Sequence, residues 1–367
     1  MRNIQFLESP EQFYTFLLSL VRAAQRNISL ATLYIGSGKQ ELELLKSIQQ
    51  LPGEVEVNLL VDGLRGNRKG LNGPIKFIRE HCPRAQVREY VSRHYAGLAK
   101  LLPDRIREIV GTQHMKIVAV DNTVIITGAN LSDIYFTNRQ DRYMVVHDCG
   151  KLAEHLHRIV QDVPGTATHG EYTLDGDETI LKFATHRENE SDEVVLSLLN
   201  NTEADSTIHV CSPYLNLSPE ILHGLEKFAH VKIITGSIES NGFHKSKGLS
   251  SLIPDAYEII KAEAGKKFEL YEYARAGWTF HPKGIWVTPR GSDTPIAIVI
   301  GSSNFSHRSF VRDVEISFSL ISRNDQVRRR MQQELDGILR HVRQPSYTRN
   351  HRSILRYLVK GPLRTFL

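Results

Sequence analysis

His114-Met115-Lys116 and His281-Pro282-Lys283 are two copies of one short pattern in a chain of 367 residues. Each copy is followed by a glycine and an asparagine, in Gly128-Ala129-Asn130 and in Gly301-Ser302-Ser303-Asn304. Eleven residues beyond each asparagine stands an acid, which is Asp141 in the first copy and Glu315 in the second. Two copies in the same register predict a duplicated chain whose halves each supply part of one shared site.

The segments around the two copies repeat one order of elements. Apolar residues at helical spacing predict helices at 10–24, 41–49 and 74–81 in the first half, and at 193–200, 219–228 and 255–263 in the second. Apolar runs predict strands at 28–35, 55–61 and 86–90, and at 207–211, 231–235 and 268–273, with each His-x-Lys pattern in a further strand. We therefore predict an α/β fold of two α/β/α sandwich halves, 1–165 and 166–343, related by a pseudo-twofold axis and sharing one active site. A charged helix at 325–342 and a basic tail at 344–367 complete the chain.

The composition is that of an ordinary globular protein, with 41% hydrophobic and 24% charged residues. The formal net charge of +5 favours anionic substrates or an anionic membrane surface. No dense run of lysine and arginine is present, so we do not expect a nucleic-acid partner. No run of about 18 apolar residues exists that could span a bilayer. The three cysteines have no paired spacing, which favours buried thiols in a reducing compartment.

The residue types of the repeated pattern suit phosphoryl transfer. Residues two apart in a strand face the same side, so the histidine and lysine of each copy point together. Lys116 and Lys283 can neutralise phosphoryl oxygens, and the amides of Asn130 and Asn304 can donate to the same oxygens. One histidine can attack phosphorus to give a phosphohistidine, while the other protonates the leaving oxygen. The residues alone do not say which histidine does which, and the charge they supply makes a metal unnecessary.

Two acids complete this candidate site. A carboxylate bonded to the far ring nitrogen would hold each histidine in the required tautomer, and Asp141 and Glu315 are placed for that role. We expect each acid to serve the histidine of the other half. The competing interpretation, two structural histidines in duplicated strands, leaves the paired lysines unexplained.

The pattern His114-x-Lys116-x4-Asp121, followed by Gly128-x-Asn130 and by the second copy, resembles the phospholipase D superfamily over nearly the whole chain. The resemblance implies that His114 is the nucleophile and His281 the general acid and base. It also adds Asp121 to the catalytic candidates. However, Thr288 stands at the matching position of the second copy, so a turn or packing role is favoured for Asp121.

The run from Gly128 to Tyr143 resembles one branch of that superfamily, the eukaryotic-type phosphatidylglycerophosphate synthases, as do the stretches at 241–243, 247–254 and 280–284. This resemblance implies that CDP-diacylglycerol and glycerol 3-phosphate are the substrates, that phosphatidylglycerophosphate and CMP are the products, and that the protein lies peripherally at the mitochondrial inner membrane. No cofactor is required for the chemistry, although a divalent cation could bind the CDP pyrophosphate. The alternatives are a phosphatidylserine synthase and a phospholipase D-type phosphodiesterase, with serine or water as acceptor.

Basic side chains at matching strand ends are the candidates for holding an anionic acceptor. Tyr214 is a further candidate, for contact with the cytidine or ribose. The substrate-binding candidates are Arg65, Arg68, Lys69, Arg139, Tyr214, His244, Lys245, Lys247, Arg308 and Arg312.

Two amphipathic segments are candidates for membrane contact. The insertion at 92–110 either packs against the core or enters the bilayer, and the basic tail at 344–367 is either a surface helix or an interfacial contact with anionic lipid.

Overall fold

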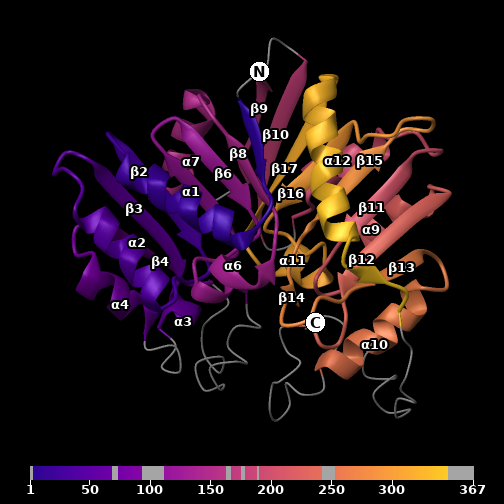
Figure 1. Ribbon diagram of the computed structural model, residues 1–367, viewed down its shortest axis with the longest axis horizontal. Helices are drawn as coiled ribbons and strands as arrows, with labels where there is room; N and C mark the ends of the chain where they lie inside the picture. Colours follow the sequence, from indigo (N-terminus) through magenta and orange to yellow (C-terminus); the bar gives the residue numbers. More distant parts are fainter. Residues whose placement is uncertain are drawn as a thin grey trace.

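The computed structural model describes residues 3–67, 73–92, 111–162, 167–174, 178–187, 190–241 and 253–345. Two mixed sheets stand side by side, and helices cover their outer faces (Figure 1). The predicted basic residues Arg68, Lys69, His244, Lys245 and Lys247 lie outside the described residues, as do nearly all of the insertion at 92–110 and of the tail. Within the described part of the chain, no helix is long and apolar enough to cross a membrane.

The first sheet has seven strands in the order β1-β8-β6-β5-β2-β3-β4. Strands β2, β3 and β4 are parallel, and β5 pairs antiparallel with β2. The strands are β1 (Ile4–Leu7), β2 (Asn27–Thr32), β3 (Glu56–Asp62), β4 (Gln86–Tyr90), β5 (Ile117–Val120), β6 (Thr123–Thr127) and β8 (Tyr143–Val146).

The second sheet has nine strands in the order β18-β13-β12-β11-β15-β16-β17-β10-β9. Its run from β17 to β13 repeats the run from β8 to β4 of the first sheet, with the same parallel and antiparallel pairings. The strands are β9 (His169–Leu174), β10 (Thr179–His186), β11 (Thr207–Cys211), β12 (His230–Gly236), β13 (Glu269–Tyr273), β15 (Gly284–Thr288), β16 (Ala297–Gly301), β17 (Glu315–Ser322) and β18 (Val342–Arg343). The duplication predicted from the sequence is therefore present in the topology.

Helices α1, α2 and α4 pack on the outer face of the first sheet, and α8 and α9 on that of the second. Ser9 and Ser218 cap α1 and α9 with their hydroxyls, each followed by a proline at the first helical position, where a missing N–H costs nothing. The helices are α1 (Pro10–Arg22), α2 (Lys39–Gln49), α3 (Gly63–Gly66), α4 (Pro74–His81), α6 (Asp133–Thr137), α7 (Gly150–Gln161), α8 (Glu193–Asn200), α9 (Pro219–Glu226), α10 (Ile253–Ala264), α11 (His307–Val311) and α12 (Asp325–Leu339).

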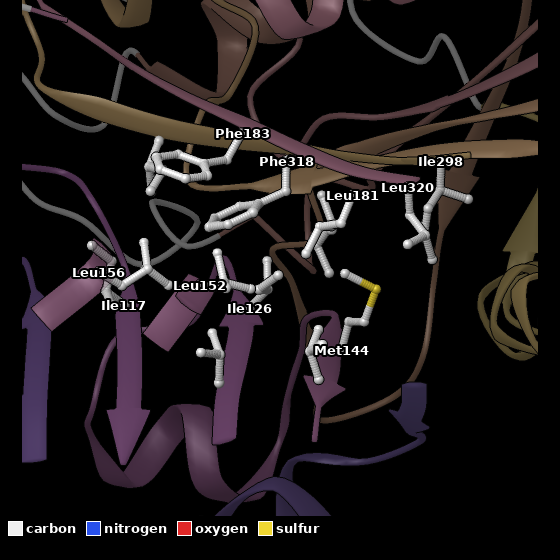
Figure 2. Close-up of a cluster of buried hydrophobic side chains, with 14 of the residues drawn as sticks. Ile117, Ile126, Met144, Leu152, Leu156, Leu181, Phe183, Ile298, Phe318 and Leu320 are labelled. Atoms are coloured by element: carbon white, nitrogen blue, oxygen red, sulfur yellow. The ribbon is translucent and has the colours of Figure 1, made fainter. Parts of the chain in front are cut away.

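A continuous apolar core joins the two sheets. Figure 2 shows Ile126 and Met144 of the first sheet facing Phe318 and Leu320 of the second, with Leu152 of α7 beside them. Successive strand residues alternate between faces, so Ile117 reaches this shared core while Val118 packs beneath the outer helices. Each such buried side chain contributes about 1.5–3 kcal/mol, which holds the two halves in one fixed arrangement.

The structure shows that two predictions from the sequence are wrong. The His-x-Lys segments are not in strands: each immediately precedes one, β5 or β15. They leave the sheet because they hydrogen bond to the other half, with His114 N donating to Val314 O at 2.8 Å and His281 N to Gln140 O at 2.9 Å. The predicted helix at 325–342 ends at Leu339, and strand β18 follows it.

Candidate active site

The two His-x-Lys segments cross between the halves. Short strand β14 (Thr279–Phe280) runs parallel to β7 (Arg139–Gln140), and Gln113 makes the matching bridge to Val314. Each histidine therefore sits against the segment that carries the acid of the other half. This exchange builds one centre from two copies, at the lower end of the sheets in Figure 1, where β14, α6 and α11 meet.

Each histidine contacts the acid that the register predicts. His114 Nδ1 lies 2.9 Å from both Oε1 and Oε2 of Glu315, and His281 Nδ1 lies 2.7 Å from Oδ2 of Asp141. Both carboxylates are fully buried, while the side chains of His114 and His281 are 12% and 6% exposed. With Nδ1–H donated to a carboxylate, Nε2 of each ring carries the lone pair.

Burial and charge set the protonation states of these four groups. Burial lowers the pKa of His114, although Glu315 opposes the shift. Burial alone would raise the pKa of Glu315, but His114 and Lys116 outweigh it and lower that pKa to about 2. The pKa of His281 falls well below its usual value because of burial and the nearby cations Lys283 and Arg139. Burial raises the pKa of Asp141 to about 6. At neutral pH both imidazoles are thus neutral and both carboxylates are ionised.

The two lysines lie between the histidine–acid pairs and are 1% exposed. Lys116 Nζ donates to the carbonyl of His114 at 2.6 Å, and Lys283 Nζ donates to that of His281 at 2.9 Å. Burial lowers the pKa of Lys116 to about 7 and that of Lys283 to about 8, with Glu315 and Asp141 opposing the shift. Ammonium groups buried in this way gain most from an anion bound between them.

The two asparagines stand at the ends of the inner strands. Asn130 Nδ2 donates to the Tyr135 hydroxyl at 3.1 Å, and Asn130 Oδ1 accepts from Thr32 at 3.3 Å. In the described part of the chain, Asn304 Oδ1 is buried without a hydrogen-bond partner. The glycine of the first copy is required because the halves approach closely: a Cβ at Gly128 would lie 2.9 Å from Asp141 Oδ1 and 3.2 Å from Gly301 O.

Tyr135 is a site residue that the sequence reasoning missed. Its hydroxyl lies 3.2 Å from His281 Nε2, and its side chain is 2% exposed. The residue falls five positions after Asn130, within the short helix α6, where the second copy has Ser309. Only the crossing of β14 onto β7 brings it to the histidine, so a comparison of the two copies could flag the position but not its contact.

Arg65, Arg308 and Tyr214, which the sequence predicts as substrate-binding residues, make defined contacts. The guanidinium of Arg65 lies 5.1 Å from the Tyr34 ring, and Arg308 pairs with Asp313 at 3.1 Å. Burial lowers the pKa of Arg312. The ring of Tyr214 lies 6.2 Å from that of His281.

Arg142 follows the first asparagine by twelve residues but does not face the centre. It is 1% exposed and pairs with Glu334 through two 2.8 Å contacts. It also donates to the Lys283 carbonyl at 3.2 Å and lies over the Trp286 ring at 3.8 Å. Arg142 therefore ties the halves together behind the site rather than facing a ligand.

Asp121 lies apart from this centre, in the turn between β5 and β6. Its carboxylate accepts hydrogen bonds from the backbone N–H groups of Gln25, Arg26 and Asn27 at 2.8, 2.8 and 3.0 Å. These contacts give Asp121 a structural role in the turn, as the threonine at the matching position of the second copy, Thr288, suggested. They do not support Asp121 as a catalytic residue.

Comparisons with known proteins agree with this architecture. The family model described as "Cardiolipin synthase, PLD-like domain" matches residues 195–339. The crystal structure of phosphatidylserine synthase from Haemophilus influenzae Rd KW20 superposes with a TM-score of 0.71 at 19% identity, covering 99% of this chain and 93% of that one. At that identity the likeness concerns the fold, which is therefore the two-half phospholipase D-like fold.

Similar sequences specify the family within that fold. The Dictyostelium discoideum protein named "Probable CDP-diacylglycerol--glycerol-3-phosphate 3-phosphatidyltransferase" is 30% identical over 90% of this chain and 71% of its own length. The Homo sapiens protein named "CDP-diacylglycerol--glycerol-3-phosphate 3-phosphatidyltransferase, mitochondrial" is 29% identical over 92% of this chain and 77% of its own length. The chain belongs to the family of CDP-diacylglycerol–glycerol-3-phosphate 3-phosphatidyltransferases. The resemblance stated from the sequence is confirmed.

Proposed function

We propose that this chain transfers the phosphatidyl group of CDP-diacylglycerol to glycerol 3-phosphate, releasing CMP and forming phosphatidylglycerophosphate. The observation that carries the proposal is the pair of histidine–carboxylate contacts, one on each side of two buried lysines. This arrangement suits attack on phosphorus from one side with protonation on the other. The family of the chain supports the choice of substrates.

In the first step, the Nε2 lone pair of His114 attacks the phosphorus that carries the diacylglycerol. The P–N bond forms, the P–O bond to CMP breaks, and His281 gives the proton on its Nε2 to the departing oxygen. His281 can carry that proton once the substrate binds, because Lys283 and Lys116, two of the cations that lower its pKa, are groups that a bound pyrophosphate neutralises. Glu315 stabilises the positive charge that develops on the His114 ring.

In the second step, His281 is neutral and takes the proton of the acceptor hydroxyl. The acceptor oxygen bonds to phosphorus, the P–N bond breaks, and His114 regains its lone pair. Asp141 holds His281 in the same tautomer through both steps. Lys116 and Lys283, with Asn130 and Asn304, stabilise the extra negative charge of each transition state.

No cofactor takes part in these steps, because the lysines and asparagines supply the charge. A divalent cation could still bind the pyrophosphate of CDP-diacylglycerol and assist its binding. Turnover should persist after exhaustive treatment with a chelator at saturating CDP-diacylglycerol; complete loss, restored by a divalent cation, would contradict this part of the proposal.

The site of action is proposed to be the mitochondrial inner membrane, with peripheral contact to anionic lipid. The support is the mitochondrial designation of relatives and the amphipathic insertion at 92–110. Replacing Leu101 and Leu102 by serine should release the protein from liposomes that contain anionic lipid. Unchanged co-sedimentation would remove this segment from the membrane contact.

One assay separates the candidate acceptors. Labelled CDP-diacylglycerol is incubated with glycerol 3-phosphate, with serine, or with neither. CMP release that depends on glycerol 3-phosphate, with a phosphatidylglycerophosphate product, is expected. Release that depends on serine, or that is equal in buffer alone, would favour the synthase or phosphodiesterase alternatives instead.

A further inference from the structure

The two halves differ at two positions that flank the site. Five residues after each asparagine stand Tyr135 and Ser309, and nine residues after it stand Arg139 and Asp313. The acids that follow, two residues later, are equivalent. Arg139 and Asp313 therefore place opposite charges at matching positions of the two copies. The chemistry that the two copies have in common does not explain this difference.

On the His114 side, the charge at this position is neutralised within the protein. Asp313 Oδ1 accepts from the backbone N–H of Thr112 at 2.9 Å and from its hydroxyl at 3.0 Å. Asp313 Oδ2 pairs with Arg308 Nε at 3.1 Å. Both carboxylate oxygens of Asp313 are thus already engaged within the protein, so Asp313 is poorly placed to bind a ligand.

On the His281 side, the matching charge contacts a hydroxyl and an aromatic ring. Arg139 Nε donates to the hydroxyl of Thr279, the counterpart of Thr112, at 2.9 Å. Its guanidinium lies over the Tyr135 ring, 4.7 Å from the centroid. Among the described residues no carboxylate lies within ion-pairing distance of Arg139, although the side chain is partly buried. A guanidinium removed from water without an anion is costly, and its fork of donors suits a phosphate.

Tyr135 links this arginine to the reaction centre. Its hydroxyl accepts from Asn130 Nδ2 at 3.1 Å, which leaves the hydroxyl proton to point at His281 Nε2, 3.2 Å away. Nε2 is the atom that must exchange a proton with the alcohol oxygen. The hydroxyl thus occupies the place beside Nε2 that an acceptor oxygen would take.

We propose that Tyr135 and Arg139 form the subsite for the acceptor, in which Arg139 holds the phosphomonoester and Tyr135 guides the acceptor hydroxyl to His281 Nε2. This inference rests on the proposed function and adds the basis of its acceptor choice. When the acceptor enters, the Tyr135 proton turns from Nε2 to the acceptor oxygen. Nε2, which also lies 3.2 Å from Lys283 Nζ, can then take the acceptor's proton. Serine and water lack a phosphate and gain nothing from Arg139, so the subsite favours a phosphorylated alcohol over either.

The test measures the KM values for the two substrates separately in Arg139→Gln. The apparent KM for glycerol 3-phosphate should rise more than fivefold, while the KM for CDP-diacylglycerol changes less than threefold. A rise below fivefold, or an equal rise for CDP-diacylglycerol, overturns the assignment. Arg158→Gln, at a side chain 67% exposed on α7, is the matched control and should alter neither value.

Two more conservative variants test the same assignment in case Arg139→Gln does not fold. Arg139→Lys keeps the charge but not the fork, and Thr279→Val removes the acceptor that orients the guanidinium. Each should raise the KM for glycerol 3-phosphate by an intermediate factor with an unchanged thermal midpoint, and no rise in either would also overturn the assignment. Tyr135→Phe should lower kcat about tenfold while the KM for CDP-diacylglycerol is kept.

These outcomes are distinct from a failure of the proposed function. If the unaltered chain shows no product that depends on glycerol 3-phosphate, the proposed function fails. If that product forms but Arg139→Gln keeps the normal KM for glycerol 3-phosphate, only the subsite fails.

Discussion

The two halves share six strands in one order, one His-x-Lys segment and one acid, yet they surround their histidines differently. His114 faces both oxygens of Glu315, with a neutralised arginine–aspartate pair nearby. His281 faces one oxygen of Asp141 and has a tyrosine hydroxyl on Nε2. Two residues before that acid stands Arg139, which contacts the Thr279 hydroxyl and makes no ion pair with a described carboxylate. Duplication thus accounts for the geometry of the centre, and divergence at a few positions gives the two histidines different surroundings.

The largest expected effect comes from removing either histidine. His114→Asn and His281→Asn should each lower kcat/KM by about a thousandfold or more, because nucleophile and acid–base act as a unit. The comparison predicts different residual reactions. His281→Asn should still release CMP slowly in one turnover, whereas His114→Asn should release none above the rate of the double variant. Equal single-turnover bursts from both variants would contradict the division of roles.

A second large effect concerns stability rather than activity. Arg142 and Glu334 form a buried pair that joins the halves, so Arg142→Met leaves the Glu334 carboxylate buried without its partner. Breaking such a pair costs about 3–5 kcal/mol of unfolding free energy, whereas replacing both partners by apolar residues costs much less. Denaturant unfolding of Arg142→Met, Glu334→Leu and the double variant tests this, and a double variant as unstable as the single ones would argue against a tie between the halves.

The dependence of kcat/KM on pH should distinguish the two lysines. On the acid side kcat/KM falls as Asp141, with a pKa of about 6, and His114, with a lowered pKa, become protonated. On the alkaline side it falls as Lys116, with a pKa of about 7, and Lys283, at about 8, lose their charge. The optimum of kcat/KM should therefore lie between about pH 6 and pH 7, and kcat/KM should fall by up to about tenfold per pH unit on either side.

Arginine keeps its charge at every pH of interest, so it can separate the two contributions. Lys116→Arg should move the alkaline limb upward more than Lys283→Arg does, even where kcat is reduced. An alkaline limb that stays in place in both variants would mean that neither lysine controls it.

The smallest expected effect is at Asp121, which the first copy has and the second lacks. Asp121→Ala should destabilise the fold by about 1–3 kcal/mol, because three backbone N–H groups lose their acceptor. The kcat of the folded fraction should stay within twofold of the unaltered chain. A hundredfold loss of kcat with unchanged stability would return Asp121 to the catalytic group.

Much of the fold and the centre could be predicted because the copies keep one register. The helix at 74–81, the strand at 207–211 and both histidine–acid contacts follow from local periodicity and from matched offsets. The crossing of β14 onto β7 could not be predicted, because it depends on how two sheets pack rather than on either sequence segment. The role of Arg142 could not be predicted either. An arginine beside the site can face a ligand, or it can pair with a buried glutamate 192 residues further along the sequence, as it does here.

We propose that His114 carries the phosphatidyl group between the two substrates. The direct measurement is to incubate labelled CDP-diacylglycerol without acceptor, quench under alkaline conditions that preserve phosphohistidine, and locate the label by peptide mass spectrometry. We expect an acid-labile adduct on His114 that glycerol 3-phosphate discharges to phosphatidylglycerophosphate. An adduct on His281, or CMP release that never occurs before the acceptor is added, would contradict it.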